Sequence, residues 1–234
     1  MPLSGGLSEK YGNRYEGKWI ARCLAELLAE EVEVVRLEPP GEEGEGCELR
    51  LKRRGTIEYH QVKRQHSLQQ GWTIPELGRR GVLRTAFEKT AGADSKYVFA
   101  SSVSAGGFEE LIEPARQRVS LSEFRKEYLK GSRGQAWKDL LREWRPQLVA
   151  ALGGGIKRNA ADEPCEALAY ERLQRIEVRT MDEISLGEWV ETKCRTLSTK
   201  NPRETFGAII VYASEHPTAE IHANALWEYL SSLG

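Results

Sequence analysis

The sequence predicts an α/β protein in which a mixed central sheet is flanked by helices. Two observations indicate this class. Short runs of apolar and β-branched residues alternate along the chain with longer segments whose apolar residues recur at helical spacing. The composition, 40% hydrophobic and 29% charged over 234 residues, is that of a globular protein that buries a sizeable core.

Composition also excludes several classes of protein. No apolar run has the length of a membrane span, and the N-terminus has no basic region followed by an apolar one, so we expect neither a membrane anchor nor a secretory leader. The four cysteines lie far apart and form no Cys-x-x-Cys pair. We therefore expect reduced thiols in a bacterial cytoplasm, and no zinc site or disulfide framework.

The first predicted helix covers residues 13–31. Asn13 is suited to cap it, and Glu16 lies three residues later, in the position of a capping box. An apolar stripe at helical spacing follows, made of Trp19, Ile20, Cys23, Leu24, Leu27 and Leu28. A strand is predicted over 32–37, and the prolines and glycines of 38–46 predict a loop.

The next two predicted strands form a hairpin. Residues 47–52 alternate polar and apolar side chains, and residues 57–63 combine β-branched, aromatic and polar ones. With Arg54–Gly55 as the turn, Glu48 is the cross-strand partner of Gln61. An acid and an amide are therefore expected side by side on one face of the hairpin.

Lys63 belongs to the same face as Gln61, because side chains alternate along a strand. Burying an unpaired ammonium group is costly, so this face is either solvated or occupied by an anion. The hairpin register supplies an anion, the Glu48 carboxylate. His60 belongs to the other face, and the four histidines show no metal-binding spacing, so we interpret them as structural or surface residues.

The rest of the chain continues the alternation. Pro75 suits the first turn of a helix over 75–91, and residues 96–102 are typical of a buried strand. Trp137 and Trp144 stand at helical spacing and are interpreted as core residues in preference to a base-stacking platform. Further helices are predicted over 107–118, 121–130, 134–151, 163–174, 186–197, 204–215 and 219–233, and a further strand over 176–180.

Charge is unevenly distributed along the chain. Between Arg50 and Lys89 ten basic residues face three acidic ones, a local net charge of +7 in a chain of net charge −1. Such a segment favours a polyanion docking on one side of the protein. The alternative is that these residues are only the solvated faces of ordinary helices and strands.

Gly153–Gly155 is the best candidate for a domain boundary. Ile156 and Lys157 follow it where a phosphate-binding loop would have Gly-Lys-Ser/Thr, so we expect no NTP site. We divide the chain into a core, residues 1–152, and a mainly helical C-terminal extension, residues 153–234. Strand 176–180 of the extension either returns to the main sheet or stays apart from it.

Four residues form the candidate site: Glu16, Glu48, Gln61 and Lys63. Glu16 continues the buried stripe of the first helix into its first turn. A carboxylate there is most simply a cap and a partner of the helix macrodipole. It is also where an acid would lie if this end of the helix met a metal site.

This set of residues resembles the PD-(D/E)xK nuclease core in its Gln-x-Lys form. More closely, it is similar to the double-stranded-DNA endonuclease domains of bacterial anti-phage systems, which stand at the N-terminus of STAND-type NTPase phage sensors and in CBASS-associated nucleases. The likeness is strong over 12–102 and loose beyond. The segments that carry it are Gly12-Asn-Arg-Tyr-Glu16, Glu48, Tyr59-His-Gln-Val-Lys-Arg64, Trp72-Thr-Ile74, Gly81-Val-Leu83, Val98-Phe-Ala-Ser-Ser102 and Trp227-Glu-Tyr-Leu230.

The resemblance implies a restriction-endonuclease-like core and a metal-dependent endonuclease that hydrolyses double-stranded DNA with low sequence selectivity. Glu48, Gln61 and Glu16 would hold Mg²⁺ or Mn²⁺, and Lys63 would position water and phosphate. It also implies a C-terminal sensor or NTPase part in a longer protein, and a homo-oligomer when active. The DNA backbone would be followed by Arg64, Arg79, Arg80 and Arg84.

The sequence departs from that family at its acid. The position of Glu48 is usually Asp and often follows another acid, whereas Cys47 precedes it here, and the neutral Gln61 leaves fewer charges to hold a metal. A second hypothesis follows from this. The chain would be a catalytically silent DNA-binding or oligomerisation module of a larger defence sensor.

Overall fold

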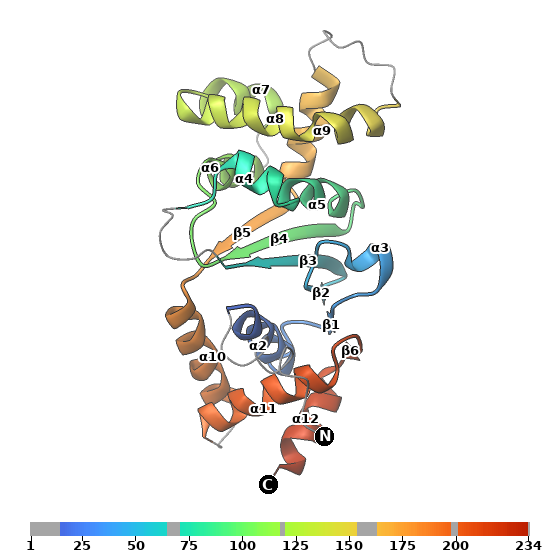
Figure 1. Ribbon diagram of the computed structural model, residues 1–234, viewed down its shortest axis with the longest axis vertical. Coiled ribbons are helices and arrows are strands. Elements are labelled where there is room, and N and C mark those ends of the chain that lie inside the picture. Colours follow the sequence, from blue (N-terminus) through green and yellow to red (C-terminus); the bar gives the residue numbers. More distant parts are fainter. Residues whose placement is uncertain (1–14, 65–70, 118–119, 154–162, 198–200, 234) are drawn as a thin grey trace. The chain divides into compact units, whose positions relative to one another are not determined.

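The chain forms a mixed α/β structure around six strands. The computed structural model describes residues 15–64, 71–117, 120–153, 163–197 and 201–233 (Figure 1). The strands follow the order β5-β4-β3-β2-β1-β6 in one mixed sheet, and helices flank it. The predicted α/β class is therefore confirmed. The strands are β1 (Val34–Leu37), β2 (Leu49–Arg53), β3 (Thr56–Lys63), β4 (Ser95–Ser101), β5 (Ile176–Thr180) and β6 (Glu220–Ile221).

The chain divides into two compact units that do not follow a single boundary in the sequence. The first unit comprises residues 1–64, 100–102 and 181–234, and the second comprises 65–99 and 103–180. The end of β4 belongs to the first unit and the rest of that strand to the second. The candidate site of Glu16, Glu48, Gln61 and Lys63 lies wholly in the first unit.

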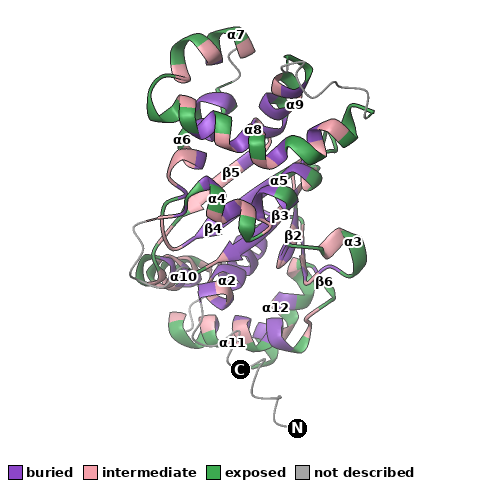
Figure 2. Cartoon of the chain, turned by 45° about the horizontal axis from the view of Figure 1, so that its top comes forward, coloured by how far each residue is buried: buried purple, intermediate pink, exposed green. Residues whose placement is uncertain are grey.

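The first unit is built around helix α2 (Tyr15–Leu28), which packs against α10 (Glu183–Leu197), α11 (Pro202–Glu215) and α12 (Ala223–Ser232). All six residues of its predicted apolar stripe are buried, and Figure 2 shows α2 as a buried element. Asp182 precedes α10 and accepts hydrogen bonds from the backbone N–H groups of Ile184 and Ser185, which fixes where that helix begins. The predicted cap Asn13 lies outside the described residues.

The second unit is mainly helical. Its helices are α4 (Ile74–Arg79), α5 (Val82–Lys89), α6 (Gly107–Arg116), α7 (Leu121–Glu123), the π-helical turn η1 (Phe124–Tyr128), α8 (Ser132–Ala151) and α9 (Glu163–Leu173). Trp137 and Trp144 on α8 are buried core residues. The Trp144 indole donates to the Leu83 carbonyl at 2.7 Å and meets Phe87 edge-on, which joins α8 to α5.

Four local features differ from the prediction. The helix predicted over 121–130 is the short α7 followed by the π-helical turn η1, and the helix predicted over 219–233 is strand β6 followed by α12. The single helix expected over 75–91 is two helices, because Gly81 adopts a left-handed conformation (φ 74°) between α4 and α5. The loop expected over 38–46 contains a short helix, α3 (Gly41–Gly44), which follows Pro40 in extended conformation. At Gly81 the backbone conformation of one residue divides the helix, and the periodicity of apolar residues does not predict that.

Cys23, Cys47, Cys165 and Cys194 are all buried free thiols. Within the parts of the chain that the structure describes, no helix combines the length and the hydropathy that crossing a bilayer requires.

Candidate functional site

The hairpin of β2 and β3 has the register that the sequence predicts. Arg54 and Gly55 form its two-residue turn, both with positive φ (49° and 77°), as the tight turns that match the twist of a hairpin require. Leu49 pairs with His60, and the Glu48 N–H continues the ladder by donating to the His60 carbonyl at 3.0 Å. The same register extended by one residue sets Glu48 beside Gln61.

Glu48 is held by two donors from β3. Its Oε1 accepts a hydrogen bond from Lys63 Nζ at 2.7 Å, and its Oε2 accepts one from the Val62 N–H at 2.7 Å. The Glu48 side chain is 16% exposed and that of Lys63 32%. The anion that the Lys63 face needs is thus supplied inside the hairpin.

Several interactions act on the pKa of the Glu48 carboxyl in opposite directions. Burial raises the pKa of the Glu48 carboxyl above its ordinary value, and the nearby charge of Glu16 acts in the same direction. The Lys63 ammonium and the Val62 N–H oppose that rise in pKa without reversing it. Glu16 from the first turn of α2 is therefore close enough to Glu48 to interact with it, and Gln61 is buried beside them, 4% exposed. The structure brings all four predicted site residues into one region.

The Glu48 carboxylate, which the prediction assigns to a divalent cation, is paired within the chain. Both oxygens of Glu48 are already engaged, so a cation would compete with Lys63 for the same carboxylate. Across the described ranges no group of three or more His, Cys, Asp or Glu side chains is placed to hold a metal ion. Binding of Mg²⁺ or Mn²⁺ at Glu48, Gln61 and Glu16 stays a prediction.

A buried polar network that the sequence did not reveal lies on the other face of β3. The Trp19 indole donates to His60 Nδ1 at 3.1 Å, and His60 Nε2 lies 3.2 Å from the Glu58 carboxylate. Arg53 connects Glu58 to Glu26 of α2. His60 is fully buried, so its interpretation as a structural residue fits this network. The signal in the sequence is the i, i+2 spacing of Glu58 and His60, which puts both on one strand face.

The basic segment is largely neutralised within the chain. Arg64 pairs with Glu183 at 3.2 Å, and Arg84 pairs with Glu88 at 2.8 Å. At least six of the ten basic residues between positions 50 and 89 form ion pairs with acids: Arg50, Lys52, Arg53, Lys63, Arg64 and Arg84. Acids both near in the sequence and far from it, such as Glu88 and Glu183, therefore offset much of the positive charge of this segment.

The other two arginines predicted to bind DNA, Arg79 and Arg80, are both exposed. Arg79 closes α4 and Arg80 follows it, in the second unit. Arg64 lies in the first unit, at the end of β3. The four arginines thus come from both units of the chain.

Comparison with known proteins gives a likeness in fold only. No protein-family model and no curated protein matches the sequence. Two solved structures are similar over 94% of this chain. One is the Cap4 SAVED/CARF-domain containing receptor of Acinetobacter baumannii, described with the cyclic trinucleotide 2′3′3′-cAAA (11% identity, TM-score 0.51). The other is the Cap4 SAVED/CARF-domain containing receptor of Moraxella osloensis (9% identity, TM-score 0.52).

The match covers 44% of the first receptor and 46% of the second, so this chain spans less than half the length of either. These findings overturn the nuclease resemblance and the endonuclease function drawn from it. The solved proteins that share the fold are described as SAVED/CARF-domain receptors, and neither a family model nor a curated relative supports a nuclease. The mixed α/β class holds, whereas the restriction-endonuclease-like assignment and double-stranded DNA as partner are unsupported.

The endonuclease prediction was wrong because its motif consists of few residues, which two different arrangements share. An acid, an amide and a lysine on one face of a hairpin are the residues of a metal-assisted phosphodiesterase. They are also the residues of an internal ion pair next to a buried amide. In this chain the Lys63 ammonium meets the Glu48 carboxylate directly, which is the second arrangement.

Proposed function

We propose that this chain is a sensing module of a larger anti-phage receptor, and that it acts by binding a cyclic oligonucleotide without cutting DNA. The likeness in fold carries the proposal, since it extends over 94% of the chain and involves two receptors of one kind. The ligand class comes from the Acinetobacter receptor, which is described with a cyclic trinucleotide. The remainder of such a receptor would belong to a longer protein.

The candidate site supports binding without cleavage. Hydrolysis of a phosphodiester in the predicted manner needs a carboxylate that holds a cation and a lysine that meets the phosphate. Here Glu48 and Lys63 occupy each other at 2.7 Å, and the second Glu48 oxygen accepts from Val62. The ion pairs of Arg64 and Arg84 also favour a partner smaller than a DNA duplex, because fewer cations are left to follow its backbone.

The experiment is a calorimetric titration of the whole chain with 2′3′3′-cAAA, with linear triadenylate as the control for non-specific attraction of phosphates. We expect saturable binding of the cyclic ligand and much weaker binding of the linear one. Ligand at a hundredfold its Kd should stabilise the chain by about 2.7 kcal/mol. For a chain of this size that corresponds to a rise in Tm of about 5–10 °C.

A parallel assay tests the absence of cleavage. Supercoiled plasmid is incubated with the chain and Mg²⁺, alongside the variant Lys63→Ala. We expect both proteins to leave the plasmid intact, with and without 2′3′3′-cAAA. Nicking by the native chain that Lys63→Ala abolishes would overturn the proposal, and so would a failure of 2′3′3′-cAAA to bind.

The same samples serve two further measurements. A titration with Mg²⁺ alone tests whether Glu48, Gln61 and Glu16 hold a cation, with Glu48→Gln as the variant that should lose any such binding. Light scattering with and without 2′3′3′-cAAA tests whether the ligand drives self-association.

A further inference from the structure

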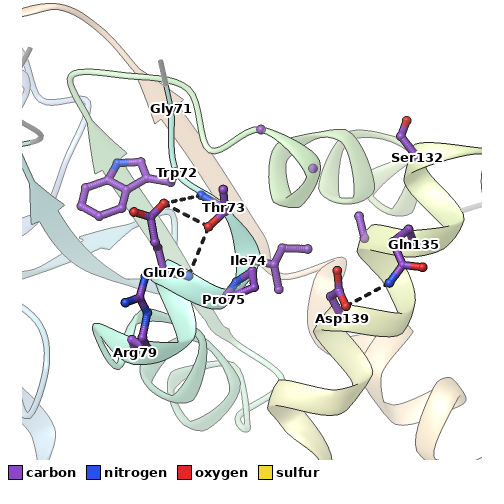
Figure 3. Close-up of a pocket in the computed structure, with 13 residues that line it drawn as sticks. Gly71, Trp72, Thr73, Ile74, Pro75, Glu76, Arg79, Ser132, Gln135 and Asp139 are labelled. Carbon is purple, nitrogen blue, oxygen red and sulfur yellow. Dashed lines mark hydrogen bonds between the residues drawn. The ribbon is translucent and has the colours of Figure 1, made fainter. Parts of the chain in front are cut away.

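The second unit contains a cavity of about 790 Å³ that is wide open to solvent. Its walls come from three separate stretches: residues 71–79, which include α4, the start of α6 at 106–107, and the first turns of α8 at 132–139. Figure 3 shows Trp72, Thr73 and Glu76 on one side of it and Ser132, Gln135 and Asp139 on the other. None of the residues predicted from the sequence as catalytic lines it.

The walls are fixed by close backbone packing. A Cβ at Gly71 would lie 3.0 Å from the Ser104 carbonyl oxygen, and one at Gly106 would lie 3.0 Å from that of Trp72. The Trp72 N–H donates to the Ser104 carbonyl at 2.8 Å, which ties the two segments together. Glycine at these positions lets the strand-to-helix segments approach closely, which fixes the backbone on this side of the cavity.

The polar groups of α4 facing the cavity have different roles. Thr73 and Glu76 are occupied by each other in a capping box, in which the Thr73 hydroxyl accepts from the Glu76 N–H and the Glu76 carboxylate accepts from the Thr73 N–H. Arg79, one turn later, is exposed and also lines the cavity. Among the described residues that line this cavity, Arg79 is the one with a cationic side chain.

On the α8 wall, Gln135 is exposed and bonds a residue one turn further along its own helix. Its Nε2 donates to Asp139 Oδ1 at 3.1 Å, and that oxygen also lies 2.9 Å from Arg142. A carboxamide has two N–H groups and an acceptor oxygen, so one N–H and the oxygen of Gln135 point away from this bond. A neighbouring donor and acceptor in one plane match the edge of adenine, which Gln recognises in a bidentate manner.

We propose that this cavity binds one adenine nucleotide unit of the cyclic oligonucleotide. The base packs on the apolar wall of Ile74, Pro75 and Ala136, its edge bonds the Gln135 carboxamide, and its phosphate meets the Arg79 guanidinium. This assignment rests on the proposed function for the identity of the ligand, whereas the cavity and its polar groups stand on their own geometry.

The test compares three variants of the whole chain by calorimetry with adenosine monophosphate, adenosine and 2′3′3′-cAAA. Arg79→Ala should weaken adenosine monophosphate about tenfold, the effect of one charge-assisted hydrogen bond, and leave adenosine unchanged. Gln135→Ala should weaken both ligands. Lys138→Ala is the matched control, since Lys138 is an exposed cation of α8 outside the cavity, and it should behave as the native chain.

The outcomes separate this proposal from the one on which it rests. If 2′3′3′-cAAA binds the native chain, Gln135→Ala and Arg79→Ala equally well, the cavity is not its site, although the sensing function stands. If 2′3′3′-cAAA does not bind but adenosine monophosphate does, with the expected losses, the sensing function fails and the adenine site stands. Tighter binding of guanosine or uridine monophosphate, or adenosine monophosphate binding that Gln135→Ala leaves unchanged, overturns the adenine assignment.

Discussion

The ion pair of Glu48 and Lys63 has a strength that can be worked out from its exposure and measured. Exposed pairs contribute about 0.2–1 kcal/mol, and breaking a fully buried pair costs about 3–5 kcal/mol. With Glu48 16% exposed and Lys63 32%, this pair lies between those limits. We expect a coupling energy of about 1–2 kcal/mol at neutral pH, measured by urea unfolding in a double-mutant cycle of Glu48→Gln and Lys63→Met.

The coupling should also depend on pH in a defined direction. Because burial raises the folded-state pKa of Glu48, its carboxyl keeps a proton in the folded chain at pH values where the unfolded chain has lost it. That protonation contributes stability which is present below the unfolded pKa and is lost as the pH rises through the folded one. Relative to Glu48→Gln, the native chain therefore loses free energy of unfolding across this window. The coupling to Lys63 is lost as the pH falls through the folded-state pKa of Glu48, because the protonated carboxyl no longer pairs with the ammonium.

A control pair joins Lys52 of β2 to Glu33, the residue before β1. Lys52 and Glu33 are 3.3 Å apart with side chains 50% and 46% exposed, so the cycle of Lys52→Met and Glu33→Gln should give a coupling of at most about 0.5 kcal/mol. A Glu48–Lys63 coupling no larger than that of the control, or one that persists unchanged in acid, would refute the reasoning about this site.

Further changes test the structure at four separate places. Gly81→Ala puts a Cβ on a residue in the left-handed conformation and should lower the stability of the fold by about 1–2 kcal/mol. Gly207→Ala, in α11 with nothing near the added Cβ, should raise it by about 0.5–1 kcal/mol. Thermal unfolding distinguishes the two signs. His60→Phe leaves the buried Trp19 indole without its acceptor and should cost about 1–3 kcal/mol in urea unfolding, and no loss would mean that the network does not form. Thr73→Ala removes the cap of α4 and should cost about 1 kcal/mol, with Thr73→Ser as the variant that restores it.

The sequence was sufficient for much of the local structure, because local interactions fix it. The Arg54–Gly55 turn sets the register of the hairpin, and that register alone brings Glu48 next to Gln61 and Lys63. The apolar stripe of α2 is likewise a property of spacing, and it is buried as predicted. Such features depend on residues that are neighbours in the chain or across one turn.

Other features depend on residues far apart in the sequence and could not be read from it. The partner of Arg64 is Glu183, at the start of α10, so the basic run looked unopposed when its own segment was considered alone. The cavity of the second unit is assembled from three helices that no motif connects. The division into two units that each combine distant segments follows from the same long-range packing.

The functional error had a different origin. Residue types at a motif's spacing specify which groups meet, and in this chain Glu48 and Lys63 do meet. They do not specify whether those groups are reserved for a ligand or satisfied by each other. Only the distance between the two groups and the second donor, the Val62 N–H, distinguish these possibilities.

The central claim is that the chain binds a cyclic oligonucleotide and leaves DNA intact. Calorimetry of the whole chain with 2′3′3′-cAAA in the presence of Mg²⁺ and supercoiled plasmid, followed by electrophoresis of the same sample, measures both parts at once. We expect saturable binding and an unbroken plasmid. No binding, together with nicking that Lys63→Ala abolishes, would contradict it.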